Sequence, residues 1–195
     1  MIESKLIPKA IFADKSIKSV NKLCDYAGIK YIASMNQTHS DIVTFVKSSQ
    51  IYDADGIYTE KSKLGLVVQT ADCMPILLSD KKRVGAIHSG WRGLKNNIVK
   101  KAIKKFDINQ LSISIGPHAQ SCCYEIKEDV KEHFNDYTEL REGMFFLNMS
   151  QILKDLSEDK GFQIEVSSIC TICDSSFNSY RENKTTERQF GVIWR

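Results

Sequence analysis

The sequence predicts an α+β fold in which helices and mixed-sheet strands form α/β layers. Apolar residues switch between helical and strand periodicity several times, without strict alternation of strand and helix. Two of the apolar segments flank a short polar turn, which is typical of an antiparallel hairpin. The 195 residues contain only three prolines and no flexible linker, so we expect a single domain over residues 1–195.

The first expected element is a helix over residues 16–27, with Ser16 as its N-cap. Gly28 follows the last apolar residue of this helix and is a typical stop. A short strand is then predicted at residues 31–34. A second is predicted at residues 42–46, because that segment is rich in β-branched side chains.

The predicted hairpin lies in the middle of the chain. Leu64–Val68 is expected to be a buried strand, and Ile76–Leu78 is interpreted as its continuation after Pro75. Residues 79–82 are polar and form the turn, and Val84–His88 is the returning strand. We therefore expect the segments on the two sides of this turn to pair as a hairpin.

A helix is predicted to begin in the segment Gly90–Gly93. Its apolar face has helical spacing and consists of Leu94, Ile98, Ala102 and Phe106. The other face carries five lysines, which are Lys95, Lys100, Lys101, Lys104 and Lys105. We interpret this lysine face as solvated and not as a nucleic-acid surface.

The last part of the chain is expected to hold three strands, at residues 113–115, 164–169 and 190–194. Two more helical stripes are predicted between the first two of these strands. The first stripe is formed by Ile126, Val130 and Phe134, and the second by Ile152, Leu153 and Leu156.

Composition and charge limit the functional classes. With 27 basic and 24 acidic residues the net charge is +3, which does not favour a nucleic-acid partner but allows an anionic substrate group. The first twelve residues lack the apolar run of a signal peptide, and no stretch approaches about 20 apolar residues. We expect a cytoplasmic protein without membrane contact, whose six cysteines are reduced thiols, metal ligands or nucleophiles.

Three residues stand out as candidates for chemistry: His39, Cys73 and His88. Each ends or interrupts an apolar strand beside small residues, and polar groups in a buried strand are costly unless they are paired. Their spacings match neither a His-x-x-x-His nor a paired Cys-x-x-Cys motif. The residues alone therefore leave two interpretations open, which are a metal or catalytic site and a hydrogen-bonded histidine beside an inert core cysteine.

Six segments resemble, in order, the motifs of the YfiH family, the laccase-domain proteins first described as multicopper polyphenol oxidases. The resemblance covers residue 31 to the end of the chain. The segments are Gln37–Val43, Asp53–Gly56, Thr70–Pro75, Gly85–Gly93, Gly116–Pro117 with Cys122–Ile126, and Cys170–Thr171 with Phe177–Arg181.

The resemblance implies that Zn²⁺ is bound by His39, Cys73 and His88. Two imidazoles and one thiolate would leave the fourth position of a tetrahedral zinc ion open, as catalytic zinc requires. The family activity that it implies is phosphorolysis of adenosine, inosine and methylthioadenosine, with deamination of adenosine as a second reaction. The expected partners are thus a small-molecule purine nucleoside and phosphate, and the expected enzyme is a zinc-dependent purine nucleoside phosphorylase and adenosine deaminase.

Two other activities are weighed. The YfiH fold is related to that of Cys–His deamidases, so Cys73 as nucleophile and His88 as base could form a hydrolase or protein deamidase. His39 discriminates here, because a dyad does not need it and a zinc site does. A copper polyphenol oxidase is the weakest alternative, since four histidines are too few for several copper centres. A zinc-stabilised interaction module is a non-enzymatic alternative.

Three neighbouring residues have candidate roles of their own. Asp72 either orients a ligand histidine or acts as a base, or it is a structural carboxylate paired with a backbone amide. Arg92, at an expected helix start, either binds phosphate or forms a surface ion pair beside Trp91 as a core side chain. Tyr124 is a candidate for stacking on a purine.

The remaining cysteines and histidines are given plain roles. Cys122 and Cys123 are interpreted as packing at a helix start, with soft-metal binding as the alternative. Cys170 and Cys173 are interpreted as structural or incidental, because no second pair completes a zinc knuckle. The two other histidines, His118 and His133, are expected to be exposed.

The chain also departs from the family pattern. Family members carry a longer N-terminal region, whereas Phe12–Lys15 here runs almost directly into the first predicted helix. We therefore expect a YfiH-type domain with a shortened N-terminal region. Near the other end, Asn178, Glu182, Asn183 and Glu187 replace usual family residues. These departures leave the three expected ligands intact and bear on substrate range and turnover.

Overall fold

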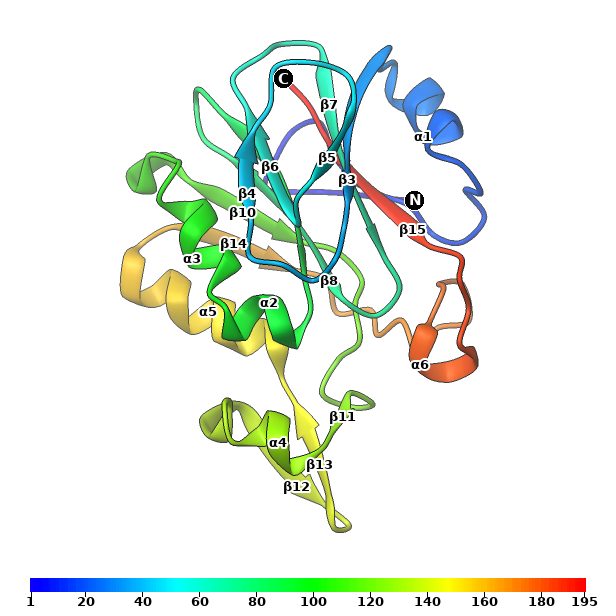
Figure 1. Cartoon of the computed structure of the whole chain (residues 1–195), viewed down its shortest axis with the longest axis vertical. Coiled ribbons are helices and arrows are strands. Elements are labelled where there is room, and N and C mark those ends of the chain that lie inside the picture. Colours follow the sequence, from blue (N-terminus) through cyan, green and yellow to red (C-terminus); the bar gives the residue numbers. More distant parts are fainter.

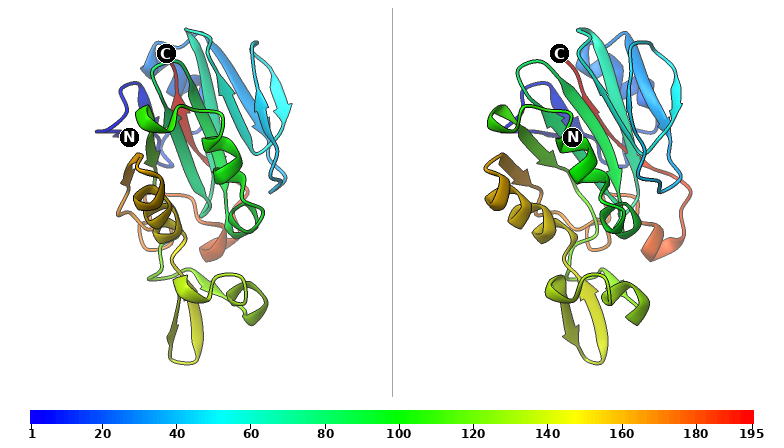
Figure 2. Two further views of the ribbon diagram at one scale, coloured as in Figure 1. Left: turned by 90° about the vertical axis from the view of Figure 1, so that its left-hand side faces the viewer. Right: turned by 60° about the vertical axis from the view of Figure 1, so that its left-hand side comes forward.

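The computed structural model describes all residues 1–195 and has two six-stranded mixed sheets packed against each other (Figures 1 and 2). The first sheet has the order β1 (Ile2–Glu3), β2 (Ala10–Phe12), β15 (Gln189–Ile193), β7 (Leu64–Thr70), β3 (Tyr31–Asn36) and β5 (Ile51–Asp53). The second has the order β14 (Gln163–Val166), β10 (Ser112–Ile115), β8 (Met74–Ser79), β9 (Val84–Ser89), β6 (Gly56–Thr59) and β4 (Val43–Phe45).

Helices cover the outer faces of both sheets, which gives four layers (Figure 2). The single helix over the first sheet is α1 (Val20–Ala27). The second sheet is covered by α2 (Trp91–Lys95), α3 (Ile98–Ile103) and α5 (Met149–Lys160). Short 3-10 helices lie at Ile108–Gln110 and Asn135–Tyr137. No helix of the chain is both long and apolar enough to cross a membrane.

A small lobe, at the bottom of Figure 1, extends from the second sheet. It is a three-stranded antiparallel sheet of β11 (Glu125–Ile126), β13 (Met144–Leu147) and β12 (Thr138–Arg141), with α4 (Glu128–Lys131) beside it. The last helix, α6 (Tyr180–Asn183), lies near the end of the first sheet, and Arg181 Nη1 donates a hydrogen bond to the carbonyl oxygen of Glu125 in β11.

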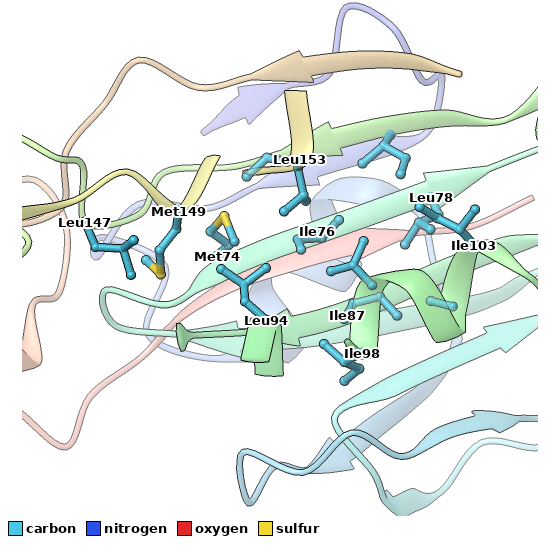
Figure 3. Close-up of a cluster of buried hydrophobic side chains, with 14 of the residues drawn as sticks. Met74, Ile76, Leu78, Ile87, Leu94, Ile98, Ile103, Leu147, Met149 and Leu153 are labelled. Carbon is cyan, nitrogen blue, oxygen red and sulfur yellow. The ribbon is translucent and has the colours of Figure 1, made fainter. Parts of the chain in front are cut away.

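Alternation along the central strands creates three hydrophobic clusters, one between the sheets and one under the helices on each outer face. On β7, Leu66 and Val68 point into the space between the sheets, whereas Val67 packs toward α1. On β8, Leu77 joins the core between the sheets, and Ile76 faces the helices (Figure 3). Both faces of these strands are buried, which explains their nearly continuous apolar sequence.

The α+β class and most of the expected elements are confirmed. The predicted hairpin is β8 paired with β9, with Leu78 opposite Gly85. Gly28 ends α1 with a left-handed φ of 66°, the conformation that favours glycine at this position. The lysines that were expected to be solvated are all exposed.

Four local expectations are wrong. Ile76–Leu78 does not continue the strand before it, because the chain leaves the first sheet after Thr70 and enters the second at Met74. Helix α1 is capped by Ser19, while Ser16 instead bonds Asp14.

The other two concern helices that are shorter than expected. The stripe after Gly90 forms two helices, because Asn97 adopts a left-handed φ of 61° between them. Within the apolar stripe at residues 126–134, only the four residues of α4 are helical, because Ile126 is in strand β11. Helical spacing of apolar residues therefore predicted the buried face correctly in both cases, but not the length of the helix.

Candidate metal and substrate site

His39, Cys73 and His88 come together at one end of the two sheets. His39 follows β3 of the first sheet, Cys73 lies on the turn from β7 to β8, and His88 is on β9 of the second sheet. Their ligating atoms all lie within 4.8 Å of one another. Cys73 Sγ is 3.9 Å from His39 Nε2, and the two imidazole rings are 4.8 Å apart at an angle of 76°.

The backbone around these residues is shaped to bring them close. His39 has a φ of 62° and Asp72 a φ of 83°, so both turns use the left-handed conformation. Gly90 leaves room for the thiol, because a Cβ atom at this position would lie 2.7 Å from Cys73 Sγ. The site therefore depends on tight turns at the end of three strands.

Asp55, which the sequence analysis did not single out, holds both histidines in place. Its buried carboxylate lies 2.7 Å from His88 Nδ1. It also accepts hydrogen bonds from the backbone N–H groups of Thr38, His39 and Ser40. Asp55 belongs to the segment Asp53–Gly56, but a single sequence does not distinguish it from its exposed neighbour Asp53.

The electrostatics of the metal-free group favour a thiolate beside an imidazolium. Although burial disfavours the thiolate, hydrogen bonds to His39 and His88 lower the pKa of Cys73 to about 6. Burial also disfavours the imidazolium, but Asp55 and Cys73 raise the pKa of His88 to about 9. Against the effect of burial, His88 and Ser40 lower the pKa of Asp55 to about 2.

This donor set fits a metal ion. Two imidazoles and a thiolate are ligands for a tetrahedral ion with one position left for a further group. Because the Asp55 carboxylate bonds His88 Nδ1, the other ring nitrogen of His88 is left as the donor. A metal-bound histidine usually donates a hydrogen bond from its other ring nitrogen to a carboxylate, and the buried Asp55 is placed to be that carboxylate.

A pocket of about 550 Å³ opens beside the three residues. This volume is in the range of small-molecule sites. Its lining combines three arginines with three aromatic rings, and these six residues are Arg92, Arg181, Arg188, Trp91, Tyr124 and Tyr180. Thr70 also lines the pocket, and its buried Oγ1 has no hydrogen-bond partner. A ligand could satisfy this hydroxyl.

Asp72 is buried in the wall of the pocket and is held by two donors. Its carboxylate accepts a hydrogen bond of 2.8 Å from Thr171 Oγ1 and one of 2.7 Å from the backbone N–H of Arg181. Asp55, and not Asp72, contacts and orients the His88 ring. The contacts of Asp72 match the structural alternative, and a catalytic role for it stays a prediction.

Arg92 and Tyr124 both line the pocket, each in a cation–π pair. The exposed guanidinium of Arg92 lies 4.6 Å from the ring centroid of Trp91 and forms no ion pair. Tyr124 is buried, and the guanidinium of Arg181 lies 4.6 Å from its ring centroid. Helix α2 has only five residues, so its dipole gives less support to an anion at Arg92 than the expected long helix would.

Two expectations about the other histidines and cysteines are wrong. His118 is buried, and its Nδ1 lies 2.9 Å from the carbonyl oxygen of Gly116, whereas His133 is exposed as expected. Burial lowers the pKa of His118 to about 4. Cys122 and Cys123 lie in a turn, not at a helix start, and they meet Cys170 and Cys173 in one cluster. The two pairs of cysteines are about 50 residues apart in the sequence, and folding brings them together.

Comparisons with known proteins identify the family to which this chain is similar. A family model described as multi-copper polyphenol oxidoreductase laccase matches residues 14–195. A purine nucleoside phosphorylase of Aquifex aeolicus is 36% identical over 84% of this chain and 81% of its own length. A purine nucleoside phosphorylase of Clostridium acetobutylicum is 31% identical over 90% of this chain and 81% of its own.

Solved structures give the same result for the fold. The crystal structure of YfiH from Bacillus licheniformis, described as a hypothetical protein, superposes with a TM-score of 0.81 at 26% identity, covering 89% of this chain and 78% of that one. The structure of YlmD from Geobacillus stearothermophilus superposes with a TM-score of 0.80 at 23% identity, covering 90% and 78%. The second likeness concerns the fold alone.

Proposed function

The chain belongs to the multi-copper polyphenol oxidoreductase laccase family, which includes YfiH, and we propose that it is a zinc-dependent purine nucleoside phosphorylase. The proposed substrates are adenosine, inosine and methylthioadenosine together with phosphate. Deamination of adenosine is proposed as a second reaction of the same pocket. The relatives named purine nucleoside phosphorylase, at 36% and 31% identity, support the first reaction.

One observation carries the proposal: the His39–Cys73–His88 group opens into a pocket that holds three arginines and three aromatic rings. Guanidinium groups suit a phosphate, because their planar N–H groups match its oxygens. Aromatic rings suit a purine. The same pocket therefore has chemistry for both substrates of a phosphorylase.

We propose zinc as the ion because it prefers nitrogen and sulfur ligands in a tetrahedral arrangement. In catalytic sites three of the four ligands come from the protein, and the fourth position is left for water or substrate. His39, Cys73 and His88 would hold it, and Asp55 would keep His88 oriented. When bound, the ion would supply Lewis-acid chemistry next to the substrate pocket.

In phosphorolysis an oxygen of phosphate forms a bond to C1′ of the ribose while the bond from C1′ to the purine nitrogen breaks. The purine leaves with the electron pair of that bond and takes up a proton. Arg92, Arg181 and Arg188 would position the phosphate, since all three line the pocket. The unpaired Thr70 hydroxyl would bond a sugar hydroxyl. Tyr124 would contact the base together with Arg181, whose guanidinium already lies against the Tyr124 ring.

A product assay tests the proposal. Incubation of the zinc-loaded protein with adenosine and phosphate should yield adenine and ribose 1-phosphate. Conversion of adenosine to inosine alone, equally with and without phosphate, would contradict the phosphorylase assignment and leave the deaminase. The absence of any product from adenosine, inosine and methylthioadenosine would contradict both.

The role of Arg92 is tested by Arg92→Lys, which keeps the charge and loses the two-pronged geometry. Loss of one charge-assisted hydrogen bond costs roughly 1.5–3 kcal/mol, so kcat/KM for phosphate should fall about ten- to a hundred-fold. Deamination needs no phosphate and should change much less. Arg83→Lys is the matched control, because Arg83 pairs with Glu60 and does not line the pocket. Equal loss of both reactions in Arg92→Lys would contradict a phosphate role.

A Cys–His hydrolase or protein deamidase is the second candidate, and a specific observation favours it. Without a metal, the low pKa of Cys73, the raised pKa of His88 and the bond from His88 to Asp55 match a nucleophile, base and orienting carboxylate. His39→Ala distinguishes the candidates. A zinc enzyme should lose activity in this variant, whereas a Cys73–His88 dyad should keep releasing ammonia from glutamine-containing peptides.

The family description would also suggest copper oxidase chemistry, which the residues do not support. Only His39 and His88 of the four histidines share a potential metal group. His118 is buried against the Gly116 carbonyl, and His133 is exposed elsewhere. Several copper centres need more histidine ligands than this chain brings together.

A further inference from the structure

We infer that Cys122, Cys123, Cys170 and Cys173 form a second metal site, a structural tetrathiolate centre that binds zinc. The ligating sulfur atoms of the four residues all lie within 4.8 Å of one another. None of these cysteines is in a disulfide. The centre is separate from the proposed enzymatic function and does not depend on it.

Two turns bring these cysteines together. The first turn carries Cys122 and Cys123 and is closed by a backbone hydrogen bond from Cys123 to Gln120. The second carries Cys170 and Cys173, closed by a bond from Asp174 N to the Cys170 carbonyl. Each turn therefore presents one pair, which is how structural zinc sites are usually built from two short cysteine-bearing loops.

The sulfur spacing fits a metal better than a disulfide. Sulfur atoms around a tetrahedral zinc ion are about 3.8 Å apart, because the Zn–S bond is about 2.3 Å. Cys173 Sγ lies 3.6 Å from Cys122 Sγ and 3.0 Å from Cys123 Sγ. A disulfide would use two of the sulfurs at about 2.05 Å and leave the other two without a partner. Four converging sulfurs match the ligand number of structural zinc, in which no position stays open.

The Cys170 thiol already has a backbone donor, since Gln120 N is 3.4 Å from Cys170 Sγ. A backbone N–H group that points at a sulfur atom favours the thiolate form, which is the form that binds a metal ion. A divalent ion would offset the repulsion between four closely spaced thiolates and allow all of them to form.

The centre would hold together one wall of the pocket. The first turn leads directly into Tyr124, which lines the pocket, and the second contains Thr171, whose hydroxyl bonds Asp72. Besides the cysteines, the segments that carry the two turns are joined by the backbone bonds from Thr171 to His118 and from His118 to Ile169 and by the Gln120 side chain, which donates to the Ser167 carbonyl. A metal ion bound by both turns would add a direct link that fixes Tyr124 and Asp72 relative to each other.

The decisive experiment uses Cys73→Ser, which removes the other candidate site and leaves the cluster intact. Protein purified under reducing conditions should still contain one zinc ion per chain by elemental analysis. Replacement of that ion by Co²⁺ should give the absorption spectrum of a tetrahedral four-sulfur site, and ¹¹³Cd²⁺ should give the corresponding strongly deshielded resonance. Absence of an ion, or a spectrum with nitrogen or oxygen ligands, would overturn the inference.

Metal counts in two further variants complete the test. The wild-type chain should contain two zinc ions, Cys173→Ser one, and the control Cys24→Ser two, because Cys24 lies in the core under α1. Two zinc ions in Cys173→Ser would overturn the site. A Cys123–Cys173 disulfide found by mass spectrometry in the wild-type chain purified under reducing conditions would overturn it as well. If Cys173→Ser does not fold, the Cys73→Ser spectrum decides alone. Since the readout is metal content, failure of the phosphorylase assay does not affect it.

Discussion

Asp55 links more of the site than any other single side chain, because it accepts bonds from three backbone amides and contacts the ring of His88. We predict that Asp55→Asn weakens zinc binding about 10- to 100-fold, the usual effect of losing a carboxylate behind a metal-bound histidine. Competition with a chromophoric chelator measures this affinity. Asp53→Asn is the matched control, since Asp53 is exposed on β5. Unchanged affinity in Asp55→Asn would contradict the orienting role.

The thiol of Cys73 gives a second prediction at the scale of the residue. In metal-free protein its pKa is lowered to about 6, so alkylation by iodoacetamide should rise with a midpoint near pH 6 rather than near 9. The reason is that only the thiolate reacts. Peptide mass spectrometry follows the rate, and zinc should protect the thiol. A midpoint near pH 9 in the metal-free protein would show that His39 and His88 do not stabilise the thiolate.

Cys73 and His88 together determine how the stability of the metal-free protein depends on pH. Cys73 has its pKa lowered from 9.0 to about 6, so its contribution to the unfolding free energy is complete above pH 9 and lost as the pH falls through 6. His88 has its pKa raised from 6.5 to about 9, so its contribution is complete below pH 6.5 and lost as the pH rises through 9. Between pH 6.5 and 9 the two slopes oppose each other, and metal-free stability should vary little there.

At the scale of the element, the break between α2 and α3 depends on Asn97. Its left-handed φ of 61° costs a residue with a plain Cβ roughly 1–2 kcal/mol, while asparagine and glycine tolerate it. Asn97→Ala should therefore lower the unfolding free energy by about that amount, measured by urea denaturation. Asn97→Gly, the control, should change it much less. A stabilised Asn97→Ala would mean that the two helices fuse, as their apolar spacing alone suggests.

At the scale of the whole molecule, a metal ion held by the three proposed ligands would join the two sheets. His39 follows a strand of the first sheet, His88 lies in the second, and Cys73 is on the connection between them. An ion bound only by the folded state adds about 2.7 kcal/mol at a hundred times its Kd. For a chain of this size that raises Tm by roughly 5–10 °C.

Calorimetry of metal-free protein with and without added zinc measures this shift. In Cys73→Ser the Tm shift caused by zinc should be smaller, because one of the three proposed ligands between the sheets is missing. If added zinc raised Tm equally in Cys73→Ser and in the wild-type chain, His39, Cys73 and His88 would not form a zinc site.

The sequence by itself predicted most of the elements and the candidate metal ligands. Apolar runs on both sides of a polar turn identified the strands of the central hairpin, Gly28 identified the end of α1, and the ordered motifs identified His39, Cys73 and His88. These features are local, since periodicity and stop residues act within a few positions along the chain.

Only the tertiary structure decided which elements meet. It placed the segments before and after Pro75 in different sheets, and it brought Asp55 to His88. It also joined Cys122–Cys123 to Cys170–Cys173, about 50 residues further along the chain. The physical reason is that long-range contacts depend on how whole faces pack. A side chain's type shows what it can bind, whereas the packing of the two sheets and the turns between their strands determines what it reaches.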